Sequence, residues 1–134
     1  MIFVRPTRPE DAEKFSEWAK NTPNLDTSVF RLPETYTLCA YDDTGVLGFI
    51  PVQTPAIAST QMLESVVLKP GISDMVITGV MRELVHSVIL VSYMKNAGEL
   101  YFIGDHPETN KIAEKIFEKV EYPVYRLRLK DLEG

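Results

Sequence analysis

The segment from Gln61 to Tyr125 constrains the fold most strongly, because strand-like and helix-like stretches alternate along it. The expected order is a strand at Gln61–Leu68, a helix at Ser73–Asn96, a strand at Glu99–Gly104, a helix at Pro107–Val120 and a strand at Val124–Lys130. Strands joined by long helices favour parallel pairing, because the chain must cross back over the sheet between them. The segment therefore predicts a parallel pair of strands with helices packed on the sheet.

The longest expected helix, Ser73–Asn96, carries a wide apolar stripe. Its members recur at helical spacing and are Ile77, Val80, Met81, Leu84, Val88 and Val91. Within it, the apolar segment Met75–Met94 contains Arg82, Glu83 and His86. Charges near the middle of a segment argue against a membrane span. We therefore expect this helix to pack against a sheet.

The N-terminal part predicts a short strand followed by a helix. Ile2–Arg5 alternates, and Thr7 is placed to cap a helix that begins near Arg8–Asp11, where proline and acidic residues suit a first turn. Ala12, Phe15, Trp18 and Ala19 then share one helical face. Leu25–Leu32 fits either a short helix or an irregular loop.

The central part predicts a hairpin and one further strand. Tyr36–Tyr41 and Val46–Gln53 are strand-like, and the intervening Asp42–Gly45 is a turn signal. In the following strand, period-two alternation places Met62, Glu64, Val66 and Leu68 on one face and Leu63, Ser65 and Val67 on the other. The fold class is thus α/β (α+β): a mixed, mostly antiparallel central sheet with a parallel pair and helices on both faces, in a single domain over residues 1–134.

Composition narrows the environment and the partners. The chain has 134 residues, one domain by length, and a formal net charge of −5, which argues against nucleic-acid binding. The N-terminal stretch is too short and too soon interrupted by Pro6 for a signal peptide. The single cysteine, Cys39, cannot form an internal disulfide and is expected to be a buried, inert thiol. We expect a cytoplasmic protein with no membrane contact.

Four stretches together resemble the GCN5-related N-acetyltransferase (GNAT) family over nearly the whole chain. Ile2–Asp11 resembles the opening strand with its Arg-Pro step, and Gly45–Val52 a hairpin strand of the form Gly-x-Leu-Gly-Phe-Ile. Leu63–Pro70 resembles the central strand, and Asn110–Tyr122 the helix that begins Asn-x-x-Ala. The resemblance implies the GNAT fold and, in an active member, transfer of an acyl group from acetyl-CoA to an amine.

The cofactor loop departs from the pattern that the resemblance implies. The family places Arg/Gln-x-x-Gly-x-Gly/Ala after the central strand, because glycines let main-chain N–H groups close on a pyrophosphate at a helix N-terminus. The matching residues are Ser73, Asp74, Met75, Val76, Ile77 and Thr78, none of them a glycine. The Asp74 carboxylate would satisfy the helix dipole and repel a phosphate. Gly71 comes too early and Gly79 too late to restore the pattern.

The proton donor departs as well. Phe117 occupies the position where the family commonly has the tyrosine that protonates the leaving thiolate, and phenylalanine has no proton to donate. Glu121 replaces the family's glycine before the last aromatic residue, Tyr122. Two features of the implied chemistry are thus altered together.

Some residues remain candidates for chemistry, each with a plainer alternative. Glu64 would be a general base or simply a solvated or paired strand carboxylate, and Asn110 a pantetheine contact or an early-helix polar residue. By the resemblance, main-chain groups of Val66, Val67 and Leu68 would orient the cofactor arm. The lysines at 69, 111 and 115 would meet an adenosine phosphate or form a solvated face. His86 and His106 lie apart, with no cluster at ligand spacing, so no metal site is expected.

Two functions follow from these residues. In the first, a GNAT-fold protein has lost acyl-CoA binding and acts as a partner-binding or structural module without a cofactor, as a viral or accessory protein would use it. In the second, it is an active acyl-CoA-dependent N-acyltransferase that acts on a small amine or a protein amine and uses acetyl-CoA. A small-ligand sensor has no supporting motif. A protein partner or self-association is expected, and the Tyr125–Lys130 edge would either pair between chains or be protected by its basic residues.

Overall fold

The structure is a computed structural model, and it describes residues 1–20, 35–53, 60–63, 66–95, 97–102, 107–115 and 117–118. Its strands are β1 (Phe3–Pro6), β2 (Thr35–Asp42), β3 (Gly45–Gln53), β4 (Thr60–Leu63), β5 (Val67–Leu68) and β6 (Glu99–Phe102). Its helices are α1 (Ala12–Ala19), α2 (Asp74–Met94) and α3 (Pro107–Ala113), with a short 3-10 turn at Pro9–Asp11.

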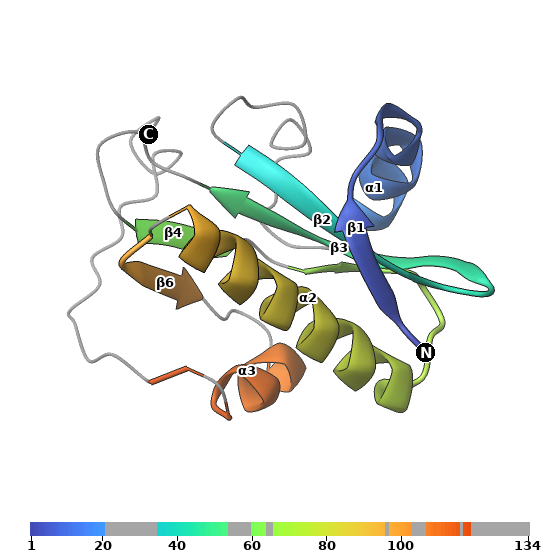
Figure 1. Cartoon of the computed structure of the whole chain (residues 1–134). Helices are drawn as coiled ribbons and strands as arrows, with labels where there is room; N and C mark the ends of the chain where they lie inside the picture. The colour runs from blue at the N-terminus through green and yellow to red at the C-terminus, as the bar shows by residue number, and fades with distance from the viewer. Residues whose placement is uncertain are drawn as a thin grey trace, which may run out of the picture.

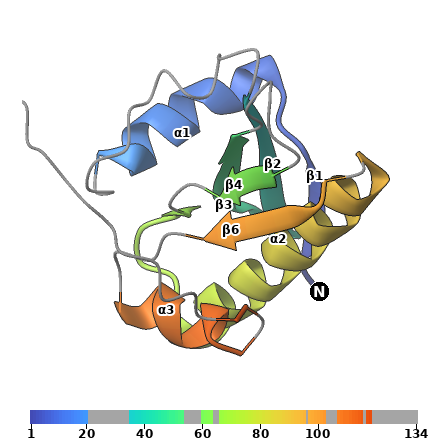
Figure 2. The same ribbon diagram turned by 90° about the vertical axis from the view of Figure 1, so that its left-hand side faces the viewer.

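One sheet runs through the molecule, with helices on both of its faces (Figures 1 and 2). The strand order is β1-β2-β3-β4-β6, and β5 also pairs with β3. The pairs β1–β2, β2–β3, β3–β4 and β3–β5 are antiparallel, whereas β4 and β6 run parallel. Figure 2 shows α1 above the sheet and α2 and α3 below it.

The predicted hairpin is confirmed. β2 and β3 pair from Thr35 opposite Gln53 to Asp42 opposite Gly45. At the turn, the Asp42 carboxylate accepts hydrogen bonds from the N–H and the hydroxyl of Thr44, at 2.8 and 2.6 Å. Gly45 has φ 122°, a conformation that favours glycine, so the turn is built from the residue types that its geometry needs.

Two apolar clusters fill the space on the two faces of the sheet. On the α2 face, Val80, Leu84 and Val88 pack against six buried residues of the sheet: Leu38, Ala40, Leu47, Ile50, Val52 and Leu63. On the α1 face, Phe15 and Ala19 pack against four: Cys39, Val46, Phe49 and Val67. The expected burial of Cys39 is confirmed, and burial raises the pKa of its thiol to about 11. The thiol therefore stays protonated at neutral pH.

The expected strand over Gln61–Leu68 is two strands, and the predicted face of Val67 is wrong. Val52 pairs with Leu63, but Phe49 pairs with Val67, so three steps along β3 match four steps on the other side. One extra residue reverses the faces of all side chains beyond it. Leu63 accordingly lies in the α2-face cluster and Val67 in the α1-face cluster.

The predicted cap of the first helix is also wrong. The Thr7 hydroxyl donates to the carbonyl of Thr37, at 3.1 Å, and so ties β1 to β2. The N–H of Arg8 donates instead to the Asp11 carboxylate, at 2.7 Å. The N-cap is Arg8, and the Asp11 side chain satisfies the N–H of this N-cap residue instead of an amide inside the turn.

The long helix α2 lies close to its predicted bounds. It ends at Met94, and the N–H of Ala97 donates to the carbonyl of Ser92, a bond typical of a helix C-terminus. Within the described part of the chain, α2 alone is long and apolar enough to cross a bilayer by length and composition. A core helix passes the same test, and one side of α2 is packed in the α2-face cluster.

Several predictions fall outside the described residues. They are the Leu25–Leu32 segment, the C-terminal strand at Val124–Lys130 and the residue His106. Of the expected helix at Pro107–Val120, α3 covers Pro107–Ala113. The strand expected at Glu99–Gly104 is observed as β6.

Candidate functional site

The sheet divides between β4 and β5, whose registers against β3 differ by one residue. β4 pairs with β6 as far as Leu63 opposite Phe102, whereas β5 pairs, among the described strands, with β3 only. The N–H of Lys69 donates to the carbonyl of Leu47, at 2.9 Å. Because hydrogen-bonded and non-bonded positions alternate along an antiparallel pair, the main-chain groups of Val66 and Leu68 are directed away from β3. They face the side on which no described strand continues the sheet.

Gly48 lets β5 and α2 approach β3 closely. A Cβ atom at this position would lie 3.0 Å from the carbonyl oxygen of Val67 and 3.2 Å from Cγ1 of Val80. The side chains of Val66 and Leu68 are half-buried against the α2-face cluster, and Val67 is fully buried on the opposite face. The predicted cofactor-arm residues are thus held by packing on both faces, with the main chain of two of them free of β3.

The predicted phosphate-binding residues form the beginning of α2. Gly71, with φ 81°, turns the chain after β5, and Ser73 is the N-cap of the helix. The Ser73 hydroxyl accepts a hydrogen bond from the N–H of Val76, at 3.3 Å, and the Ser73 carbonyl accepts one from Ile77, at 2.9 Å. The Ile77 bond is the first regular bond of the helix, so of the amides that would face a ligand at this helix N-terminus, the Val76 amide is the one seen bonded within the chain.

The side chains at this N-terminus are those of a solvated helix end. Asp74 and Thr78 are exposed, and Met75 is 85% exposed. Val76 and Ile77 are half-buried, and Val76 packs against the α2-face cluster. Among the described residues, no ion pair or side-chain hydrogen bond involves the Asp74 carboxylate. Its negative charge is free to act on whatever approaches the first turn.

Gly79, the glycine that comes too late for the loop pattern, has a packing role. It is buried on α2, and a Cβ atom there would lie 2.9 Å from Cδ1 of Ile2. The near atom is the flexible end of the Ile2 side chain, just before β1, so this position is packed against the N-terminal residues. Gly79 therefore provides no reason to place a phosphate near it.

The remaining predicted residues are spread over other elements. Asn110 is half-buried on α3, and its carbonyl accepts a hydrogen bond from the N–H of Glu114, at 2.9 Å. The ring of Phe117 stacks on that of Phe102, with centroids 6.2 Å apart, and packs against the α2-face cluster. An apolar role explains this phenylalanine. Glu64, the candidate base, lies outside the described residues.

Neither metal binding nor thiol chemistry finds support in the described part of the chain. No group of three or more His, Cys, Asp or Glu side chains there could hold a metal ion. His86 is exposed on α2. With its high pKa, the buried Cys39 is unsuited to act as a nucleophile.

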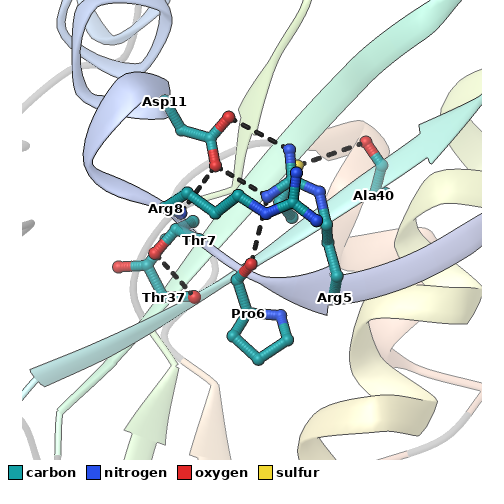
Figure 3. Close-up of polar contacts among 8 residues, drawn as sticks. Arg5, Pro6, Thr7, Arg8, Asp11, Thr37 and Ala40 are labelled. Carbon is teal, nitrogen blue, oxygen red and sulfur yellow. Dashed lines mark hydrogen bonds and ion pairs between the residues drawn. The ribbon is translucent and has the colours of Figure 1, made fainter.

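Sequence reasoning missed the best-formed polar cluster, which joins β1 to the first helical turn (Figure 3). The Asp11 carboxylate accepts two hydrogen bonds from the Arg5 guanidinium, at 2.7 and 3.1 Å, and one from the Arg8 N–H. The Arg5 hydrogen bonds lower the pKa of Asp11, against an opposing effect of burial. The same contact raises the pKa of Arg5. The only signal in the sequence was an arginine and an aspartate on either side of Pro6 and Pro9.

No known sequence family and no curated protein sequence matches the chain. Solved structures do match its fold. A ribosomal-protein-alanine N-acetyltransferase from Brucella melitensis biovar Abortus 2308 has a TM-score of 0.76 at 15% identity, covering 96% of this chain and 99% of the other. The aminoglycoside N-acetyltransferase AAC(6′)-Iy, in complex with the bisubstrate analog CoA-S-monomethyl-acetylneamine, has a TM-score of 0.72 at 16% identity, covering 96% of this chain and 99% of the other.

The matches also include a different kind of protein. A transcriptional regulator from Bacillus halodurans C-125 has a TM-score of 0.75 at 13% identity, covering 96% of this chain and 99% of the other. The fold is therefore that of the GNAT acetyltransferases. At these identities the likeness defines the fold, and the activity must be argued from the residues of this chain.

Proposed function

We propose that this chain is a GNAT-fold protein that has lost acyl-CoA binding and serves as a cytoplasmic partner-binding or structural module. The beginning of α2 carries the proposal. There the N–H of Val76 already donates a hydrogen bond to the Ser73 hydroxyl. Asp74 and Met75 lie where the resemblance implies close contact between the main chain and a pyrophosphate. The residues that would hold the cofactor thus bond to one another or oppose its charge.

The expected energetic effect is large enough to matter. A charge-assisted hydrogen bond that is not made forgoes about 1.5–3 kcal/mol. A carboxylate about 4 Å from a phosphate charge adds a repulsion of about 1 kcal/mol even in bulk water. Since about 1.4 kcal/mol is a factor of ten in affinity, the two effects together weaken CoA binding by roughly one hundredfold or more.

Calorimetric titration of acetyl-CoA into the full chain tests the proposal, with a thermal-unfolding series as a second readout. We expect no binding up to millimolar acetyl-CoA. A ligand at about one hundred times its Kd would add about 2.7 kcal/mol to the free energy of unfolding, so binding would be easily seen. Measurable binding by the unaltered chain would contradict the proposal.

The variant Asp74→Asn sharpens the test, because it removes the charge and keeps the shape of the side chain. Combined with Ser73→Gly, it should restore weak acetyl-CoA binding if these two residues close the site. Glu13→Gln on α1 is the matched control, since Glu13 is an exposed acid on the other face of the sheet. If Asp74→Asn with Ser73→Gly binds acetyl-CoA no more tightly than Glu13→Gln does, Asp74 does not lie near the phosphates.

A second candidate function, N-acyl transfer from acetyl-CoA, draws on the edge of β5 that no described strand pairs with. The main-chain groups of Val66 and Leu68 directed away from β3 are suited to hold an extended cofactor arm. The amine nitrogen would attack the thioester carbon and expel the CoA thiolate, with Glu64 or a water as base. Release of free thiol from acetyl-CoA, with a panel of small amines and an N-terminal peptide amine, would establish this activity.

A further inference from the structure

β1 forms one edge of the sheet, and part of its outer side has free main-chain groups (Figure 1). On the inner side, the N–H of Thr7 donates to the carbonyl of Thr37, next to β1 on β2, at 3.1 Å. Because bonded and non-bonded positions alternate along an antiparallel pair, the N–H and C=O groups of Ile2 and Val4 point away from β2. Among the strands that the structure describes, β2 alone pairs with β1. The outer groups of Ile2 and Val4 are therefore left for another strand.

The opposite end of this edge is closed. Pro6 takes the next outward position, and proline has no N–H to donate. Its carbonyl oxygen accepts a hydrogen bond from the Arg5 guanidinium, at 3.1 Å (Figure 3). The free stretch is thus short and symmetric in its main-chain groups. Ile2 and Val4, each with one N–H and one C=O, lie on either side of Phe3.

The side chain at the centre of this stretch is a large exposed aromatic ring. Phe3 is 47% exposed, although its ring lies 5.7 Å from that of Tyr41. Folded proteins usually protect an edge strand with charged side chains. The charged residue on β1 is Arg5, and its guanidinium is directed to Asp11. Phe3 is therefore unprotected, as expected of an edge that pairs with another strand.

Packing against α2 holds the free stretch in place. Ile2 and Val4 pack against the α2-face cluster, and a Cβ atom at Gly79 would lie 2.9 Å from Cδ1 of Ile2. The stretch is thus ordered before a partner arrives, so little entropy is lost when main-chain bonds form. Met75, which is 85% exposed, lies one turn before Gly79 on the same side of α2 and adds an apolar side chain near this edge.

We propose that β1 pairs antiparallel with β1 of a second copy of the chain, about a twofold axis at Phe3, a proposal that rests on the function as a partner-binding module. In this register, the free groups of Val4 bond to those of the partner's Ile2, and those of Ile2 bond to the partner's Val4. Phe3 lies opposite the partner's Phe3 at a non-hydrogen-bonded position, where cross-strand side chains are closest and an aromatic pair is favourable. The two sheets then form one continuous sheet.

A second copy fits this edge better than a strand of another protein. Any extended main chain meets the groups of Ile2 and Val4, but it finds no N–H at Pro6, so a longer strand gains nothing there. A different protein must also bring an apolar residue to Phe3, whereas a twofold axis supplies one by symmetry. The contact is small, so the dimer should be weak and form only at high concentration.

Charge substitution at Phe3 tests the pairing. Sedimentation equilibrium of the full chain, from micromolar to millimolar concentration, should show a monomer–dimer equilibrium. Phe3→Lys and Phe3→Glu should each weaken the dimer about tenfold or more, because two like charges then lie directly opposite and the aromatic pair is lost. An equal mixture of the two variants should form a heterodimer, because the facing charges are then opposite. This rescue follows from the twofold pairing and not from a structural role of Phe3.

A disulfide at the same position tests the register. Directly opposed residues at a non-hydrogen-bonded position have Cα atoms about 4.5 Å apart, a separation that a disulfide spans. With oxidised glutathione, Phe3→Cys chains should therefore link to each other roughly tenfold faster than Lys14→Cys chains, the matched control with an exposed site on α1. The native thiol does not compete, because Cys39 is buried.

Unfolding curves and acetyl-CoA titrations keep folding, cofactor loss and pairing apart. Each variant should unfold cooperatively at dilute concentration, because Phe3 and Lys14 are exposed. CoA binding by the unaltered chain would contradict the loss of the cofactor and leave the pairing of β1 untouched.

Several results would overturn the pairing proposal. They are a chain that stays monomeric at millimolar concentration, cross-linking of Phe3→Cys no faster than that of Lys14→Cys, and a variant mixture without heterodimer. A dimer that Phe3→Lys leaves intact would place the contact on another surface. A monomeric chain that binds an extended leucine-rich peptide, and loses it in Phe3→Lys, would assign the edge to a strand of another protein.

Discussion

Two aspartates lie where a helix starts, Asp11 just before α1 and Asp74 as the first residue of α2, and they have opposite surroundings. Asp11 is buried, accepts two hydrogen bonds from Arg5, and also accepts the N–H of Arg8. Asp74 is exposed, and no ion pair among the described residues involves it. The same residue type near the start of a helix thus joins structural elements at one junction and presents an unpaired charge to solvent at the other.

The two junctions differ in what they contribute: the one before α1 stabilises the fold, and the one before α2 determines what can bind there. At the β1–α1 junction, an arginine on the strand supplies the positive group, so the chain completes its own polar cluster. At the β5–α2 junction, Ser73 satisfies one amide, and the aspartate beside it faces solvent. We therefore expect substitutions at the first junction to change mainly the free energy of unfolding, and substitutions at the second to change mainly what can bind there.

The largest expected effect is that of Asp11→Ala. It removes three hydrogen bonds and leaves the Arg5 guanidinium, which is mostly buried, without its partner. Removing one partner of a largely buried pair should lower the free energy of unfolding by about 2–4 kcal/mol, the lower part of the range allowing for the partial exposure of Arg5. Urea denaturation gives the value directly, and for a chain of this size Tm should fall by roughly 10 °C.

Asp74→Ala is the matched control, because it removes the other aspartate at a helix beginning. An exposed acid in the first turn stabilises a helix by about 0.3–1 kcal/mol, so its loss should be much smaller than that at Asp11. Equal losses at the two positions would show that the contrast in burial between Asp11 and Asp74 has no energetic consequence.

The next effect tests how β5 is held against β3. Gly48→Ala places a methyl group 3.0 Å from the main-chain oxygen of Val67, which cannot move without shifting β5. We expect a loss of about 1–3 kcal/mol in the free energy of unfolding. Gly79→Ala is the comparison, because its methyl group meets only the flexible end of Ile2, and alanine favours a helix interior by about 1 kcal/mol. A larger loss at Gly79 than at Gly48 would contradict this account of the junction.

The acid dependence of stability provides a third, smaller effect. Because the Arg5 hydrogen bonds lower the pKa of Asp11, the contribution of Asp11 is fully present above its unfolded pKa of about 3.9 and is lost as the pH falls through the lower folded value. Unfolding curves from pH 7 to pH 2 should show a smaller loss for Asp11→Asn than for the unaltered chain. Part of the loss should remain, since hydrogen bonds from Thr44 also lower the pKa of Asp42. Identical pH profiles would rule out Asp11 as a source of acid sensitivity.

The two junctions also show what a sequence can and cannot reveal. The hairpin and α2 were predictable, because Asp42–Gly45 is a strong turn signal and apolar residues repeat at helical spacing along α2. The extra residue between β4 and β5 was not, because Val66, Val67 and Leu68 are all apolar and suit either face. When an extra residue lies in a run of apolar residues, apolar and polar positions do not alternate, so the sequence does not show the shift in register.

The candidate site was predictable in place and less so in detail. Pro70, Gly71 and Ser73 mark the turn into α2, so the sequence located Ser73–Thr78 at the helix beginning. The packing of Gly79 against Ile2 and the pairing of Arg5 with Asp11 depend on how β1 meets the rest of the fold. Contacts of that kind follow from tertiary arrangement and carry no local signature.

The smallest effect is also the most direct test of the β5–α2 junction. Ser73→Ala removes the hydroxyl that caps the Val76 amide and should lower the free energy of unfolding by about 0.5–1 kcal/mol, whereas Ser73→Gly should cost only a few tenths. Chemical denaturation of both variants resolves this difference when the slopes are fitted together. If neither variant differs from the unaltered chain, the cap does not form in solution and the Val76 amide is available to a ligand. The case for a closed phosphate site would then depend on the charge of Asp74 alone, which the acetyl-CoA titration of Asp74→Asn measures.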